Sequence, residues 1–253
     1  MKKLINWKLF FILTVTCVIT ACMVLPYSLA LTSAEIKITP VFFLLTAAQN
    51  LVLFAVVVFF GLLLSKQLSL GLTILPGLLE GENKSKELKV ILLPSIVLGV
   101  LAGVLIVLLS IPFNRLIPEF QDISISIPAW KALLASFYGG IAEEVLLRLF
   151  VVSLLVWITF KIKKTNGRPT DFGIWFSIVL AAVIFGLGHL PATAQIVPLS
   201  GIVITRAIVL NGIGGIIFGW LYWKKGLESA IIAHFSADIV LHIITPFVIS
   251  LFV

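Results

Sequence analysis

The sequence predicts an all-α, polytopic transmembrane helix bundle of about seven spans. Hydrophobic residues make up 60% of the 253 residues and charged residues only 11%, and the mean hydropathy is +1.21. This composition lies outside the range of soluble domains. Apolar runs of about 20 residues, the length that crosses a bilayer as a helix, occur near 9–32, 40–65, 89–113, 130–160, 172–190, 198–223 and 228–250.

The first apolar run has features of a signal peptide, because lysines precede it and Ile19-Thr20-Ala21-Cys22 is similar to a lipoprotein cleavage box. The run continues past Cys22 to Leu31, however, whereas the apolar core of a signal peptide has roughly 7 to 15 residues. We therefore expect a retained helix. Cys17 and Cys22 are the two cysteines of the chain, and their spacing indicates neither a disulfide framework nor a metal site.

Basic residues predict that the N-terminus is cytoplasmic and the C-terminus is outside. In this orientation thirteen lysines and arginines are cytoplasmic and three are external, in agreement with the positive-inside rule. The net charge of +7 is thus expected to face anionic lipid and not nucleic acid. The cytoplasmic set is Lys2, Lys3, Lys8, Lys66, Lys84, Lys86, Lys89, Lys161, Lys163, Lys164, Arg168, Lys224 and Lys225, and the external set is Lys37, Arg115 and Lys131.

Eight ionisable residues stand out inside the apolar runs. Residues 1–128 hold the first three helices with their loops, and residues 129–253 hold four helices with all eight of these residues. Each Asp, Lys or Arg at mid-membrane costs about 2.5 to 3.5 kcal/mol on insertion scales, so we expect them to share a polar intramembrane cavity. They are Glu143, Glu144, Arg148, His189, Arg206, His234, Asp238 and His242.

The spacing of these residues predicts which of them meet. Residues four apart share a helix face, so we expect Glu144 to pair with Arg148 and His234 to lie beside Asp238. Glu143 is turned by about 100° from Glu144 on an α-helix, which leaves one carboxylate free for chemistry. Gly139 and Gly140 precede the acids, and we expect a break or kink there because the run exceeds one straight crossing.

Three motifs on three helices, Glu143-Glu144-x-x-x-Arg148, Phe185-x-x-x-His189 and His234-x-x-x-Asp238, together resemble the CAAX protease and bacteriocin-processing family, also called Abi. This family is similar to the type II CAAX prenyl endopeptidase. The resemblance covers roughly residues 143 to 238, and it implies an intramembrane endopeptidase formed by a bundle of helices.

The resemblance also implies a role for each residue. Glu143 would be the general base that activates water, and His189 would hold that water or share its proton. Glu144 and Arg148 would be a supporting ion pair, while His234 and Asp238 would polarise the scissile carbonyl. A positioned carboxylate can accept and return a proton, and a histidine can donate to a developing oxyanion, so the chemistry agrees with the residue types.

Asp238 departs from the prenyl endopeptidases, which have asparagine at this position. An ionised Asp238 only accepts hydrogen bonds, so it must be protonated, orient His234, or bind a cation. The last alternative leaves a divalent metal such as zinc open, with Glu143, His189, His234 and Asp238 as ligands. We expect no required metal, because the sequence contains no His-Glu-x-x-His motif.

Two other functions stay open: a catalytically silent Abi-family protein with a regulatory or bacteriocin-immunity role, and a proton-coupled transporter. The complete set of acids and histidines argues against the first, and the absence of inverted repeats argues against the second. The resemblance implies that membrane-bound or lipidated peptides enter laterally from the bilayer. We expect a prokaryotic plasma membrane, with the endoplasmic reticulum as the alternative.

Overall fold

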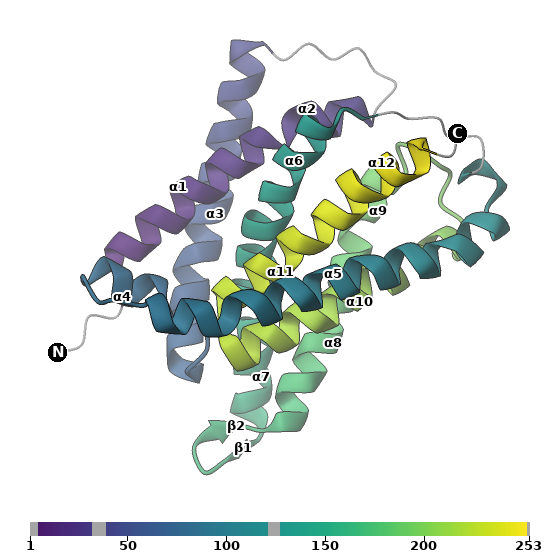
Figure 1. Cartoon of the computed structure of the whole chain (residues 1–253). Coiled ribbons are helices and arrows are strands. Elements are labelled where there is room, and N and C mark those ends of the chain that lie inside the picture. Colours follow the sequence, from purple (N-terminus) through teal and green to yellow (C-terminus); the bar gives the residue numbers. More distant parts are fainter. Residues whose placement is uncertain (1–4, 32–38, 121–126, 252–253) are drawn as a thin grey trace.

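The computed structural model describes residues 5–31, 39–120 and 127–251, and nearly all of this chain is helical (Figure 1). The N-terminal elements are α1 (Trp7–Met23), α2 (Leu25–Ala30), α3 (Pro40–Leu68), α4 (Leu75–Leu79), α5 (Ser85–Leu116) and η1 (Pro118–Phe120). The later elements are α6 (Ala129–Phe137), η2 (Tyr138–Glu143), η3 (Val145–Val152), α7 (Ser153–Ile162), β1 (Lys164–Thr165), β2 (Arg168–Pro169), α8 (Asp171–Gly188), α9 (Leu190–Thr193), α10 (Gly201–Lys225), α11 (Leu227–Ile239), η4 (Val240–Ile244) and α12 (Thr245–Ser250).

Seven helical stretches within the described residues are long and apolar enough to cross a membrane, as the sequence predicts. The chain is therefore an integral, multi-pass membrane protein. The stretches are Trp7–Ala30, Pro40–Leu68, Ser85–Leu116, Ala129–Ile162, Asp171–Thr193, Gly201–Lys225 and Leu227–Ser250. The N-in orientation stays a prediction, and Lys2, Lys3 and Lys37 of its charge count lie outside the described residues.

Glycines lie where neighbouring helices of the bundle approach each other closely. A Cβ atom at Gly99 of α5 would collide with the backbone oxygen of Ala233 in α11, and one at Gly215 of α10 would lie 2.6 Å from the Cβ of Ala182 in α8. Small residues allow such backbone approach between membrane helices. The α5–α11 and α8–α10 pairs form the frame on which the polar residues are held (Figure 1).

The fourth span changes its winding where its two glycines and two acids lie. After α6 the backbone is π-helical through η2 and η3, and α-helical geometry returns at Ser153. The helix is not interrupted at the glycines, so the predicted break is absent, and its winding becomes π-helical from Tyr138 onward. The glycines serve close packing, since a Cβ at Gly140 would lie 3.0 Å from the Cβ of Phe235 in α11. Such π-helical turns occur frequently at functional sites.

A short hairpin joins the fourth and fifth spans, and the hydropathy pattern gives no sign of it. Strand β1 pairs with β2 in antiparallel fashion. Asn166 and Gly167 between them have φ angles of 51° and 72°, which are the left-handed values that a two-residue type I′ turn requires.

The loop between α3 and α5 is fastened to the start of α11. The Glu228 carboxylate accepts hydrogen bonds from the backbone N–H groups of Thr73, Ile74 and Leu75, at 3.0, 2.9 and 2.9 Å. In return, the backbone N–H of Leu227 donates to the carbonyl of Gly71 at 2.9 Å. The charge on Glu228 suits the unpaired N–H groups at the start of α4.

Candidate active site

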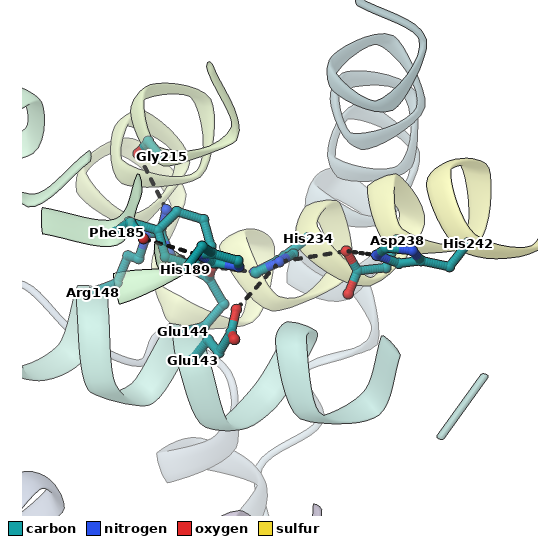
Figure 2. A network of polar contacts seen from close by, with 9 residues as sticks. All are labelled: Glu143, Glu144, Arg148, Phe185, His189, Gly215, His234, Asp238 and His242. Carbon is teal, nitrogen blue, oxygen red and sulfur yellow. Dashed lines mark hydrogen bonds and ion pairs between the residues drawn. The ribbon is translucent and has the colours of Figure 1, made fainter. Parts of the chain in front are cut away.

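The polar side chains of the fourth, fifth and seventh spans meet inside the bundle (Figure 2). Glu143, Glu144 and Arg148 come from the π-helical part of the fourth span, which turns them toward α11. His189 directly follows α8 as its C-cap, and His234 and Asp238 lie on α11. The sequence predicted that these residues share one polar site, and the structure brings them to one region of the bundle.

Arg148 is buried, and both terminal nitrogens of its guanidinium have a hydrogen-bond partner. Its Nη1 donates to Glu144 Oε1 at 2.6 Å, the pairing expected from their spacing, and its Nη2 donates to the carbonyl of Gly215 at 3.3 Å. The guanidinium also lies 5.2 Å from the ring centre of Phe185 and 5.5 Å from that of Phe218. Cation–π contacts of this kind add stabilisation when the charge is desolvated.

His234 lies between both adjacent acids of the fourth span. Its Nδ1 is 2.7 Å from Glu144 Oε1, while its Nε2 is 3.9 Å from Glu143 Oε2 and 3.6 Å from Asp238 Oδ1. A carboxylate only accepts hydrogen bonds, so Nδ1 carries a hydrogen and donates to Glu144. The imidazole also stacks on Phe218, with ring centres 4.8 Å apart. The orientation of His234 is therefore set on two sides.

The two adjacent acids differ in accessibility. The Glu144 side chain is 0% exposed, whereas that of Glu143 is 19% exposed. Glu144 Oε1 is shared by Arg148 and His234, and its buried Oε2 has no hydrogen-bond partner among the described residues. Glu143 Oε2, in contrast, makes an ion-pair contact within the described residues at 3.9 Å from His234 Nε2. Glu143 is thus the acid that a water molecule can reach.

His189 is close to the site but is held by its own helix. Its Nδ1 is 2.9 Å from the backbone oxygen of Phe185, so Nδ1 carries the hydrogen, because a carbonyl only accepts. Phe185 stands edge-on to the rings of both His189 and His234, with centres 4.7 and 5.8 Å apart. Within the described residues no hydrogen bond or ion pair joins His189 to Glu143, so its predicted role on water stays a prediction.

Gly139 leaves the space that Asp238 occupies. A Cβ atom on Gly139 would collide with Asp238 Oδ2 and would lie 3.3 Å from His234 Nε2. The missing side chain therefore lets η2 pack directly against the His234–Asp238 pair. The sequence placed this glycine beside the acids but did not indicate which residues it accommodates.

The predicted metal ligands do not gather into a metal site in the described part of the chain. No group of three or more His, Cys, Asp or Glu side chains there is arranged to hold a metal ion. Glu143, His189, His234 and Asp238 were the ligands proposed for the alternative that a metal such as zinc is bound. His234 donates from Nδ1 to Glu144, and Asp238 lies 3.6 Å from its Nε2.

Two polar contacts of the site were not predicted. His242 Nε2 lies 3.9 Å from Asp238 Oδ1, and its Nδ1 lies 3.4 Å from the hydroxyl of Tyr27 in the first span. The spacing of His242 from Asp238 could have indicated the first contact, but no sequence signal joins Tyr27 to the last span. Arg206, another of the ionisable residues within the apolar runs, donates from Nε to Asn114 at 3.1 Å.

Comparison with known protein families finds a match, which covers the segment holding most of these residues. Residues 125–240 match the family model of type II CAAX prenyl endopeptidase Rce1-like proteins. The matched segment includes Glu143, Glu144, Arg148, His189, His234 and Asp238, and it excludes Tyr27 and His242. No curated protein and no solved structure matches the chain. Residues 125–240 of this seven-span membrane protein are thus similar to the Rce1-like type II CAAX prenyl endopeptidases.

Proposed function

We propose that the protein is an intramembrane endopeptidase in which Glu143 activates water and His234 with Asp238 polarises the scissile carbonyl. The observation behind this proposal is the gap around His234 Nε2. Glu143 Oε2 lies 3.9 Å away and Asp238 Oδ1 lies 3.6 Å away, and both distances exceed a normal hydrogen bond. Reacting oxygens bound beside this nitrogen would be within reach of both groups.

The proposed reaction starts with a water molecule that donates to Glu143. Glu143 takes one proton, and the water oxygen forms a bond to the carbonyl carbon of the peptide. The π electrons of the carbonyl move onto its oxygen, and that oxygen accepts a hydrogen bond from His234 Nε2. Collapse of this tetrahedral intermediate breaks the C–N bond, and Glu143 returns the proton to the leaving amine. The products are a carboxylic acid and an amine, and no metal ion takes part.

Glu144 and Arg148 support this chemistry without touching the substrate. Glu144 holds the Nδ1–H of His234 at 2.7 Å, so when the ring is protonated its second hydrogen is on Nε2 and points to the reaction site. Asp238 faces this nitrogen and stabilises the charge of the imidazolium. His189, whose Nδ1 donates to Phe185, has Nε2 left to hold the water or accept its proton.

The position of the site within the spans supports a membrane-associated substrate. Glu143 lies near the middle of the fourth span, Ala129–Ile162, a depth that a peptide in the membrane can reach. We propose a membrane-associated or lipidated peptide that enters laterally, and a prokaryotic plasma membrane as the site of action, with the endoplasmic reticulum as the alternative. Relationship to prenyl endopeptidases supports this class of substrate.

The test is cleavage of quenched fluorescent peptides, prenylated and unprenylated, by purified protein in liposomes. Glu143→Gln keeps the shape of the side chain but cannot accept the proton, and we expect about a 10²- to 10⁴-fold loss of hydrolysis. Glu80→Gln is the matched control, since Glu80 is exposed and remote from the site. Wild-type protein treated with a chelator should keep its activity.

Loss of activity on chelation, restored by zinc, would contradict the metal-free reaction while leaving the endopeptidase intact. Equal activity of Glu143→Gln and wild type would contradict the role of Glu143. Failure of the wild type to cleave any peptide would favour the catalytically silent Abi-family protein, with a regulatory or immunity role, over an enzyme.

A further inference from the structure

The polar contacts of the site continue beyond Asp238 along one face of the last span. Asp238 Oδ1 lies 3.6 Å from His234 Nε2 on one side and 3.9 Å from His242 Nε2 on the other. Each histidine is four residues from Asp238, so all three side chains lie on the same helix face. Figure 2 shows the three in a row. One carboxylate oxygen is thus shared by two imidazoles.

A residue of the first span ends this row. The hydroxyl of Tyr27 in α2 lies 3.4 Å from His242 Nδ1, and the two rings are edge-to-face with centres 5.7 Å apart. When the phenol donates its hydrogen to Nδ1, the hydrogen of a neutral imidazole is on Nε2, which faces Asp238. Tyr27 can therefore set the tautomer of His242 that holds the carboxylate.

The backbone at the end of α11 keeps His242 in line with Asp238. The helix becomes π-helical in η4, and Thr245 Oγ1 donates to the carbonyl of Val240 at 2.7 Å. Pro246 follows, and it lacks the N–H that an α-helix would direct to the carbonyl of His242. The Thr245-Pro246 pair thus favours the wider turn on which His242 lies.

Accessibility increases along the row. The side chains of Glu144, His234, Asp238 and His242 are 0%, 6%, 12% and 38% exposed. At the buried end of the row, Arg148 holds the Glu144 carboxylate in place. At the exposed end, the Asp238 carboxylate would be free to rotate without His242, which is itself held by Tyr27.

We propose that Tyr27 and His242 are positioning residues that hold the Asp238 carboxylate against His234 Nε2. This inference rests on the proposed endopeptidase, because Asp238 acts there through His234. It makes the first span part of the active site. The family domain over residues 125–240 would then lack two side chains that the site needs.

Steady-state hydrolysis by the full chain separates positioning from folding. Tyr27→Phe keeps the ring but removes the hydroxyl, and His242→Leu removes both ring nitrogens. We expect each to lower kcat by about 10- to 100-fold with little change in KM, because misplacement of a reacting group has effects of this size. His242→Gln can place an amide N–H toward Asp238 and should recover most of the loss. In the double variant the effects should not add, because both residues act through Asp238.

Tyr222→Phe is the matched control. It removes a buried hydroxyl that is bonded to Ser153 Oγ at 2.7 Å, away from Asp238, so it should lower the unfolding temperature and leave kcat unchanged. If Tyr27→Phe and His242→Leu keep the wild-type kcat while Glu143→Gln is inactive, the positioning role is wrong and the endopeptidase stands.

A second measurement tests whether Tyr27 affects His242 and His234, and it does so even if no peptide is cleaved. The chain has three histidines, so ¹⁵N-labelled ring nitrogens can be assigned from single substitutions. Tyr27→Phe should alter the tautomer signals of His242 and also shift those of His234. Unchanged signals of both histidines would overturn the proposal, whatever the activity.

Discussion

His234 Nδ1 lies 2.7 Å from Glu144 Oε1, and this one contact ties α11 to the fourth span across 90 residues of sequence. The same oxygen accepts a hydrogen bond from Arg148 Nη1 at 2.6 Å. Glu144 is therefore committed to two fixed partners and is inaccessible. The neighbouring Glu143 keeps its freedom to react because Glu144 already balances Arg148.

Replacement of Arg148 should lower the free energy of unfolding of the protein. Arg148→Met keeps most of the side-chain length but leaves Glu144 buried with an uncompensated charge, so we expect a loss of about 3 to 5 kcal/mol in the free energy of unfolding. The measurement is denaturation in detergent, followed by circular dichroism. Lys84→Met, which breaks surface pairs with Glu82 and Glu87, should change little. Equal effects of the two substitutions would contradict the buried network.

A methyl group at Gly139 should impair catalysis more than folding. In Gly139→Ala the new Cβ meets Asp238 Oδ2, a movable side chain, so Asp238 would be pushed away from His234. We expect roughly a 10- to 100-fold lower rate of hydrolysis. Gly212→Ala is the control, because its Cβ would meet nothing within 4 Å. This control should keep full activity and stabilise α10 by up to about 1 kcal/mol. A large loss of activity in Gly212→Ala would contradict the explanation that Gly139→Ala acts by displacing Asp238.

The Glu228 contact should control the mobility of the loop before α5. Glu228→Gln replaces one accepting oxygen by a donor, and the N–H groups of Thr73, Ile74 and Leu75 then compete for the other. Hydrogen bonds to charged groups contribute about 1.5 to 3 kcal/mol, so amide exchange of these three residues should become faster. Hydrogen–deuterium exchange with mass spectrometry measures this. Exchange that is unaltered at 73–75 and faster elsewhere would contradict the role of Glu228 as their acceptor.

The main features of the bundle were predictable from local properties of the chain. Seven runs of the right length and apolarity predicted seven spans, because a helix in lipid satisfies its own backbone hydrogen bonds. The i,i+4 rule predicted that Glu144 meets Arg148 and that His234 lies beside Asp238. These are properties of single helices, and the structure has them. The same rule could not show that the fourth span is π-helical, because it assumes α-helical winding from the start.

The sequence itself determined the spans, the pairing of residues within one helix and the candidate catalytic residues, through composition, spacing and motif. Contacts between helices were decided only by the tertiary structure. Packing brings His234 to Glu144, stacks Phe185 and Phe218 on Arg148, and sets Tyr27 beside His242. The physical reason is that bilayer length and helix period act on neighbouring residues, whereas the choice of partner helix depends on close packing of side chains far apart in the chain.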